Sequence, residues 1–250
     1  MTQRARPQSV AEAAEVVEAR YGRHIAALMA YGSRVFGAAR VGSAFDFWLI
    51  VKDPAAFHHD NAEFYRTHLN VKSTPEEQAR LNRTGPLFYS LQDCEPEIKL
   101  AVLGEEPFVG LCRDEWWTVK GRMQKPLEVL RSTPAVEQAI LSARREGLAC
   151  GVNLVPREFD MNDLLFAIVG LSYHAEIRPE FKSAKIESIV EKGRESLESI
   201  YRPLLNELEY VERSGSGFVD KRNEAERRRA RRATLHALRY SKWCRRSLDF

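Results

Sequence analysis

Strand-like and helix-like patterns occupy different parts of this 250-residue chain, and the change comes near residue 130. Before it, runs rich in β-branched and aromatic residues at 45–51 and 98–103 predict strands, the first closed by a turn at Asp53-Pro54. After it, apolar residues at helical spacing predict helices at 136–148, 161–173, with Asp160 as a cap, and 184–205. A strand-containing part followed by helices is typical of the α+β class.

Three further segments complete the predicted outline. Apolar and charged residues alternate at helical spacing over 10–28, with Ser9 as a cap, and lead into an apolar run that stops at Gly32. The polar stretch 61–83 predicts an exposed helical region, and the Ser-Gly-Ser-Gly segment within 213–217 predicts a flexible linker. We therefore expect domains at 1–130 and 131–212, followed by a linker and a basic helix at 213–250.

Composition excludes several classes of protein. With 44% hydrophobic and 29% charged residues, the chain is neither wholly disordered nor fibrous. Its longest apolar stretch, 164–171, is far shorter than the roughly 20 residues of a membrane-spanning helix, and the first residues contain no apolar signal core. The four cysteines match neither a zinc spacing nor a disulfide scaffold, so we expect an intracellular protein in a reducing compartment.

Positive charge is concentrated at the C-terminal end. Residues 220–250 hold eleven Lys and Arg against four Asp and Glu, a net +7, which leaves the rest of the chain at −4. The composition of this segment favours a helix. Such a basic helix is either a solvated helix end or a surface that attracts anionic lipid head groups or nucleic acid.

One pair of features indicates chemistry on a nucleotide. Gly32-Ser33 follows an apolar run, and Asp46 lies at the start of an apolar strand thirteen residues after Ser33. A tight Gly-Ser turn lets backbone amides and a hydroxyl approach a triphosphate, while a carboxylate on a strand binds the accompanying Mg²⁺. This pattern resembles the signature of the nucleotidyltransferase superfamily, although Trp48 occupies the position where a second carboxylate is common. The alternative is an ordinary turn and strand.

A longer series of matches spans about residues 26–206. It resembles the mitochondrial translocator-assembly-and-maintenance family of soluble phosphatidate cytidylyltransferases, which also keeps a single Asp on this strand. The matching blocks, all in the family's order, are 31–36, 46–51, Asp53-Pro54, His58, Asn61, His68, Ile98-Lys99, 121–126, 171–178 and 185–190.

The resemblance implies a reaction and a fold. CTP and phosphatidic acid would give CDP-diacylglycerol and pyrophosphate, with Mg²⁺, for the synthesis of phospholipids including cardiolipin. A nucleotidyltransferase-like mixed-sheet domain with helices would be followed by a helical, winged-helix-like domain and then the basic C-terminal helix. The implied protein is cytoplasmic and attached peripherally to the inner face of the membrane through its basic tail, with nucleic acid an unlikely partner and no oligomer specified.

The same resemblance implies roles for individual residues. Asp46 would bind Mg²⁺, with Asp53 as a second candidate that is otherwise plain turn chemistry. Catalysis would further involve Lys99 and Glu176, and Glu176 stands where the family usually has Asp. The nucleotide or lipid phosphate would be bound by residues from several blocks: Tyr31, Gly32, Ser33, His58, Asn61, Arg122, Lys125 and Arg178.

Several of these residues also have a purely structural interpretation. His58 and His68 are either structural histidines or nucleotide contacts. Arg122 and Lys125 either bind phosphate or form a solvated basic cluster with Lys120. For the chain as a whole there are two alternatives. It is a nucleotidyltransferase acting on a protein, an RNA or a small phosphorylated molecule, or it is a nucleotide-binding module without turnover.

Overall fold

The computed structural model describes residues 5–68, 72–91, 93–113, 117–174 and 183–248, with the backbone alone at 65, 68, 118, 174 and 241–248. The chain forms two compact units. The first contains residues 1–110 and 127–137, and the second contains 111–126 and 138–250. Among the described residues, no helix combines the length and the apolar character needed to cross a bilayer.

The first unit is built on a mixed sheet of five strands in the order β3-β4-β2-β1-β5. β2 runs parallel to β4, and the other neighbouring pairs are antiparallel. The α+β class predicted from the sequence is therefore confirmed. The strands are β1 (Ile25–Tyr31), β2 (Phe45–Val51), β3 (Leu87–Leu91), β4 (Ile98–Gly104) and β5 (Glu128–Arg131).

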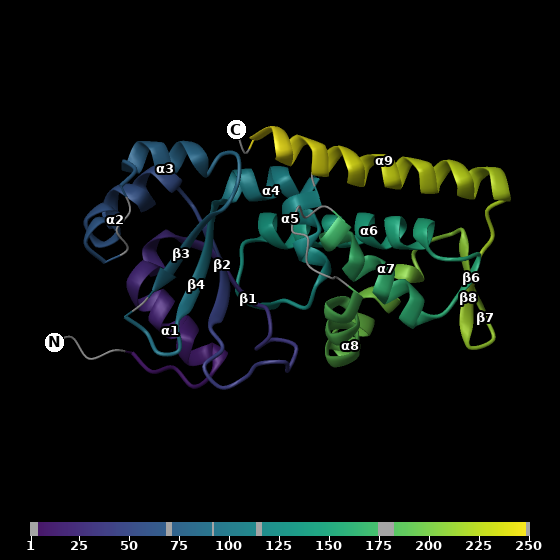
Figure 1. Cartoon of the computed structure of the whole chain (residues 1–250), viewed down its shortest axis with the longest axis horizontal. Helices are drawn as coiled ribbons and strands as arrows, with labels where there is room; N and C mark the ends of the chain where they lie inside the picture. The colour runs from purple at the N-terminus through teal and green to yellow at the C-terminus, as the bar shows by residue number, and fades with distance from the viewer. Residues whose placement is uncertain (1–4, 69–71, 92, 114–116, 175–182, 249–250) are drawn as a thin grey trace. The chain divides into compact units, whose positions relative to one another are not determined.

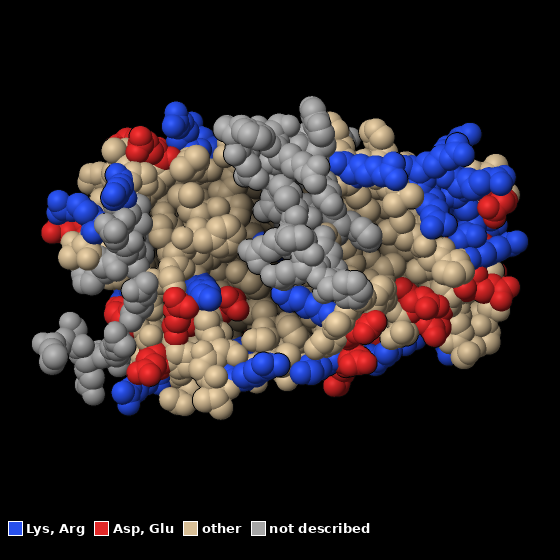
Figure 2. Space-filling view, in the orientation of Figure 1, with Lys and Arg blue, Asp and Glu red and all other residues tan. Residues whose placement is uncertain are grey.

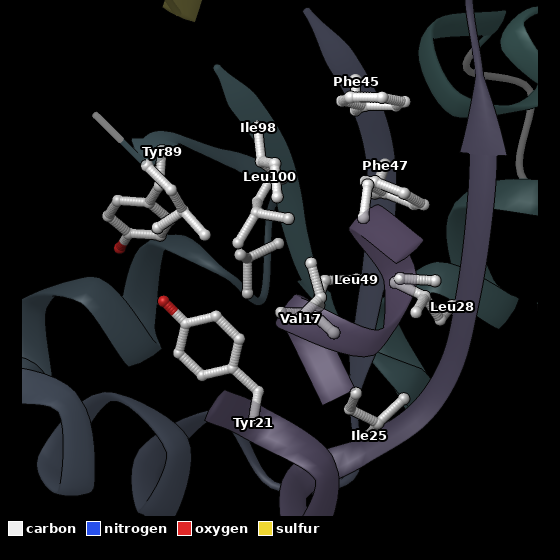
Figure 3. Packing of buried hydrophobic residues seen from close by; sticks show 14 of the residues in the cluster. Val17, Tyr21, Ile25, Leu28, Phe45, Phe47, Leu49, Tyr89, Ile98 and Leu100 are labelled. Carbon is white, nitrogen blue, oxygen red and sulfur yellow. The ribbon is translucent and has the colours of Figure 1, made fainter. Parts of the chain in front are cut away.

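One face of this sheet is the hydrophobic core of the unit. Alternate residues of β2, beginning with Phe45, and of β4, beginning with Ile98, point toward helix α1 (Val10–Tyr21), as Figure 3 shows. Val17 and Tyr21 of α1 are fully buried against them. Ser9 caps α1 by accepting a hydrogen bond from the Glu12 amide, as predicted.

Helices α2 and α3 lie wholly in this unit, and most of α4 does too. Phe57 of α2 belongs to the same core, and its ring centroid lies 5.4 Å from that of Tyr21 in α1. α3 begins with a capping box in which the side chains of Thr74 and Glu77 each accept a hydrogen bond from the other residue's amide. The bounds are α2 (Pro54–His68), α3 (Pro75–Leu81) and α4 (Glu105–Arg113); Figure 1 labels all three.

The second unit is mostly helical. A small antiparallel sheet in the order β6-β8-β7 accompanies its helices. Whether this arrangement is a winged-helix domain stays a prediction. The elements are α5 (Trp117–Lys120), η2 (Arg122–Gln124), α6 (Pro134–Leu154), β6 (Glu158–Phe159), α7 (Met161–His174), α8 (Ser183–Leu205), β7 (Val211–Ser214), β8 (Gly217–Asp220) and α9 (Glu224–Leu248), of which α6 begins in the first unit.

Several sequence predictions are confirmed and two are wrong. The strands at 45–51 and 98–103 and the three long helices after residue 130 are present, and Asp160 caps α7 through the Asp163 amide. The predicted helix over 10–28 ends at Tyr21, and 25–31 is strand β1. The predicted linker at 213–217 is the turn of the β7–β8 hairpin, where Gly215 adopts a φ of 56°.

Candidate functional site

A row of polar side chains crosses four strands of the larger sheet, on the face opposite the core. Tyr31 of β1 pairs with Asp46 of β2, Asp46 pairs with Lys99 of β4, and Lys99 pairs with Ser90 of β3. Side chains alternate between faces along a strand, and the neighbours of Asp46 on either side are core residues. Paired residues lie about 5 Å apart. The sheet therefore aligns four polar groups that are up to 68 residues apart in sequence.

Gly32 brings the chain directly over the carboxylate of Asp46. Its φ is 85°, in the left-handed region that favours glycine. A Cβ built on Gly32 would lie 2.7 Å from Oδ2 of Asp46, which is closer than real Cβ contacts come. The bend and the carboxylate thus face one another, and the missing side chain is what allows it. Ser33 follows in the same turn, where its carbonyl accepts a hydrogen bond from the Ala38 amide.

An arginine holds the loop that joins this bend to β2. Nε and Nη2 of Arg34 both donate to the carbonyl of Ser43, with Nε at 2.9 Å. The guanidinium also lies 3.8 Å from the centroid of the Phe45 ring. Arg34 thereby ties the first turn of the loop to its last residues. Its neighbours in sequence gave no indication of this contact, because only the fold brings Ser43 and Phe45 beside it.

Lys99 is held by a second carboxylate, that of Glu97. The ammonium Nζ lies 3.4 Å from Oε2 of Glu97, and the Ser90 hydroxyl donates to Oε1 of the same group. Glu97 stands two residues before Lys99, immediately ahead of β4, and in an extended chain this spacing places both side chains on one face. The sequence pattern therefore contained a signal for Glu97. Ser90 had none, because only the register of β3 against β4 brings it there.

The next row on the same face is apolar. Met29, Trp48, Ala101 and Phe88 are paired across the same four strands, two residues along each strand from the polar row. Trp48 is fully buried between Tyr31 and Phe108 of α4, with ring centroids 6.1 and 6.2 Å away. An aromatic ring thus occupies the position where a second carboxylate is common. The polar row is more open, since Asp46 is half-buried and the side chain of Lys99 is 51% exposed.

The structure argues against Asp53 as a metal ligand beside Asp46. Asp46 is the second residue of β2, and Asp53 lies beyond the other end of this strand. The five steps from Asp46 to Val51 alone cover roughly 16 Å, far more than a single ion can bridge. Oδ1 of Asp53 instead accepts hydrogen bonds from the amides of Ala55, at 2.8 Å, and Ala56. Asp53 caps the start of α2, so the turn alternative holds.

His58 and Asn61 are also on the wrong side of the sheet for the polar row. Both belong to α2, which packs on the core face through Phe57. His58 has no exposed surface, and its Nε2 lies 2.6 Å from Oδ1 of Asn82. Burial lowers the pKa of His58, because desolvation disfavours the charged ring. The predicted nucleotide contact by His58 is thus replaced by a structural role.

Asn61 shows a similar local role. Its Nδ2 donates to the carbonyl of Phe57 one turn earlier, at 2.7 Å. The side chain therefore satisfies the helix on which it stands. Its predicted contact with nucleotide is not supported by this placement, since the five-stranded sheet separates α2 from the side chain of Asp46.

The remaining predicted residues lie in the second unit. Arg122 is half-buried in η2, and Nζ of Lys125 lies 4.1 Å from the centroid of the Tyr173 ring. Lys120 is not part of a solvated cluster, because it is buried with Nζ 2.6 Å from Oε2 of Glu146. Phosphate binding by Arg122 and Lys125 stays a prediction. Glu176 and Arg178 lie outside the described residues, as does the side chain of His68.

The polar row and the glycine bend contain residues from the sequence blocks that carry the family resemblance. Comparison with known proteins gives the same family. Residues 14–241 match the family model described as mitochondrial phosphatidate cytidylyltransferase. The chain belongs to this family. Proteins named mitochondrial phosphatidate cytidylyltransferase from Caenorhabditis elegans and Schizosaccharomyces pombe are 29% and 27% identical to it over 182 and 198 residues.

These alignments cover the relatives less fully than they cover this chain. They include 65% and 70% of this chain but 54% and 48% of the two relatives. A third protein of the same name, from Caenorhabditis briggsae, is 28% identical over 182 residues and 54% of its length is covered. The chain thus spans about half the length of the curated relatives it matches.

The polar row suits a magnesium-nucleotide complex better than a metal cage made by the protein alone. Among the described residues, no three His, Cys, Asp or Glu side chains form a group able to hold a metal ion. Mg²⁺ in nucleotide enzymes is commonly held by one or two carboxylates together with substrate phosphates and water. A single carboxylate under a bend that lacks a Cβ fits that arrangement.

Proposed function

We propose that this chain transfers a cytidylyl group from CTP to phosphatidic acid, giving CDP-diacylglycerol and pyrophosphate. The proposal rests chiefly on Gly32 and Asp46, because the left-handed bend at Gly32 brings the backbone that would bind the triphosphate next to the carboxylate that would hold its cation. Membership of the family supports the same reaction.

In the proposed mechanism, the bend and the strand residues bind and orient the triphosphate. The backbone amides and hydroxyl of Gly32-Ser33 donate to its oxygens, and Lys99 supplies a permanent positive charge. Asp46 would hold Mg²⁺, which when bound neutralises charge on the transferring phosphoryl group. These residues act mainly by positioning and by charge, since phosphoryl transfer leaves little covalent work to the protein.

The bond changes are simple. A phosphate oxygen of phosphatidic acid forms a bond to the α-phosphorus of CTP, and the bond from that phosphorus to the pyrophosphate oxygen breaks. The attacking group is already an anion, so no side chain is needed as a strong general base. Arg122 and Lys125, with Arg178, are proposed to bind phosphate groups of the substrates, and Glu176 to act with Asp46 and Lys99.

We further propose that α9 holds the enzyme at an anionic membrane surface. Arg228, Arg229, Arg231 and Arg232 are exposed on the first half of this helix. Figure 2 shows Lys and Arg side chains gathered there. Each basic residue near an anionic surface contributes about 1 kcal/mol, so a few of them are enough for reversible attachment.

The direct test is a transfer assay with two matched variants. The protein is incubated with radiolabelled CTP, Mg²⁺ and vesicles containing phosphatidic acid, and labelled CDP-diacylglycerol is measured. Asp46→Asn should lower the rate at least about 100-fold, because it removes the charge that holds the cation. Asp53→Asn should stay within about twofold, because asparagine caps a helix as well as aspartate does.

Other outcomes would reject the proposal in distinct ways. Labelled RNA or protein in place of labelled lipid would assign the chain a different acceptor. Binding of CTP without any transfer would make it a nucleotide-binding module. Equal loss of activity in the Asp46 and Asp53 variants would remove the site from the polar row.

A further inference from the structure

Lys99 depends on its neighbours for its position. Its side chain is 51% exposed and carries the charge on a flexible four-carbon stem, which samples many rotamers unless something holds its end. Asp46 pairs with it across the strands, so a well-placed ammonium would lie beside the site of the proposed nucleotide complex.

Glu97 supplies the hold. Its Oε2 lies 3.4 Å from Nζ of Lys99, and its Oε1 accepts a hydrogen bond from the Ser90 hydroxyl. The backbone of Glu97 is also anchored, because its main-chain carbonyl accepts a hydrogen bond from the amide of Phe45 at 2.9 Å. Glu97 is thus fixed through its backbone to β2, the strand that carries Asp46. Its carboxylate is fixed to β3 through Ser90.

We infer that Glu97 is a positioning residue that holds Lys99 toward the substrate phosphates, with Ser90 orienting the Glu97 carboxylate. The inference rests on the proposed function for its meaning in catalysis. An exposed ion pair of this kind contributes little to stability, so its effect belongs to the placement of charge rather than to folding.

The charge of Glu97 separates this role from a purely structural one. Glu97→Gln keeps the size of the side chain and an acceptor for Ser90 but removes the ion pair with Lys99. We expect kcat/KM for CTP to fall about tenfold, with the urea midpoint unchanged, while Glu106→Gln at the opposite end of β4 leaves kcat/KM as it was. Ser90→Ala should lower kcat/KM by a smaller factor in the same direction.

A double-mutant cycle shows whether the effect passes through Lys99. In a Lys99→Met background, Glu97→Gln should cause no further loss. A loss of the same size in both backgrounds would overturn the inference, as would wild-type activity in Glu97→Gln. A rise in kcat/KM would also overturn it, since that result means that Glu97 acts only by repelling the substrate phosphates.

A second readout does not depend on lipid transfer. An amine-acetylating reagent is applied with and without Mg²⁺ and CTP, and labelling of Lys99 is followed by mass spectrometry with Lys52 as the internal control. In Glu97→Gln, Lys99 alone should be labelled several-fold faster than in the wild type. The variant should also lose at least about half of the protection that CTP gives Lys99 in the wild type.

The two readouts distinguish failure of the inference from failure of the proposed function. If the wild type makes no CDP-diacylglycerol but Lys99 shows this Glu97-dependent protection, the proposed acceptor is wrong and the positioning role stands. Unchanged labelling and unchanged protection in Glu97→Gln would overturn the positioning role whatever the acceptor is.

Discussion

The two faces of the five-stranded sheet carry different kinds of side chain at the same strand positions. On one face, Phe45, Phe47 and Leu49 of β2 are buried against α1 (Figure 3). On the other, Asp46 lies half-buried in a polar row, and Trp48 behind it is covered by α4. Along β2 the first face is fully covered, whereas on the second face Trp48 is covered and Asp46 is only half-buried.

This difference separates stability from proposed function on a single strand. Residues that alternate along β2 belong to opposite faces, so a change at one position should alter folding and a change at the next should alter chemistry. The site can therefore lie on a rigid strand without weakening the core. Four variants test how complete this separation is, beginning with the one expected to have the largest effect.

Phe47→Ala should have the greatest effect on stability. Removing a fully buried ring leaves a cavity, and the free energy of unfolding should fall by about 3–5 kcal/mol. Urea unfolding measures this loss. The kcat measured without urea at low temperature should stay near the wild-type value. Phe88→Ala is the matched control on the opposite face, since Phe88 is 60% exposed and its loss should cost under about 1 kcal/mol. Equal costs would mean that the two faces are not distinct.

Of these four variants, Gly32→Ala should have the greatest effect on activity. Its Cβ would press on Oδ2 of Asp46 and displace the carboxylate from the bend. The transfer rate should fall about 100-fold, or roughly 2.7 kcal/mol in the barrier.

The control for this variant is Gly42→Ala. Gly42 has a φ of 80° but no atom within 4 Å of a Cβ built there. It should lose about 1 kcal/mol of stability from backbone strain and keep its transfer rate. If both variants lose activity equally, loop strain and not contact with Asp46 governs the site.

His58 should make the stability of the core face depend on pH. Burial lowers its pKa in the folded state, so the unfolded chain takes up a proton first as the pH falls below about 6.5. Stability should therefore decrease with falling pH, by at most about 1.4 kcal/mol per pH unit. Urea midpoints between pH 8 and 5 measure it, and His58→Gln should flatten the curve. A stability that increases toward pH 5, or an unchanged curve in the variant, would contradict this.

Arg34→Lys should have the smallest effect, because it loosens the loop between β1 and β2 and removes no residue of the core or of the polar row. A lysine cannot reproduce both hydrogen bonds to the Ser43 carbonyl together with the stacking on Phe45. We expect a loss of about 1 kcal/mol in the free energy of unfolding. Arg40→Lys, an exposed arginine of the same loop, should change it by less than about 0.5 kcal/mol. Similar values for the two variants would show that the Arg34 contacts contribute nothing.

Residue type and local spacing predicted much of the candidate site. Gly32 and Asp46 were expected from the chemistry they suit and Lys99 from the family resemblance, and the structure places them together. Asp53 and His58 stayed open between two roles in the sequence, because their residue types suit both a ligand and a cap or buried partner. Only neighbours distant in sequence, or the far end of β2, distinguish these roles.

The strand β1 shows the same limit for the fold. Residues 25–30 are all buried, so this segment lacks the alternation of a half-exposed strand, and its first four residues fit the helical spacing predicted over 10–28. The hairpin of β7 and β8 was missed because its Ser-Gly-Ser-Gly turn has the composition of a linker.

Short-range patterns in the sequence determined the α+β class, the strands β2 and β4, the long helices and the types of residue available for phosphate chemistry. Spacing along one segment is a local property, and hydrophobic periodicity reports it directly. Strand order and register were decided only by the tertiary structure, because pairing joins segments whose separation in sequence carries no such period. Register is what places Ser90 beside Lys99, and the packing of α2 on the core face is what leaves His58 on the far side of the sheet from Asp46.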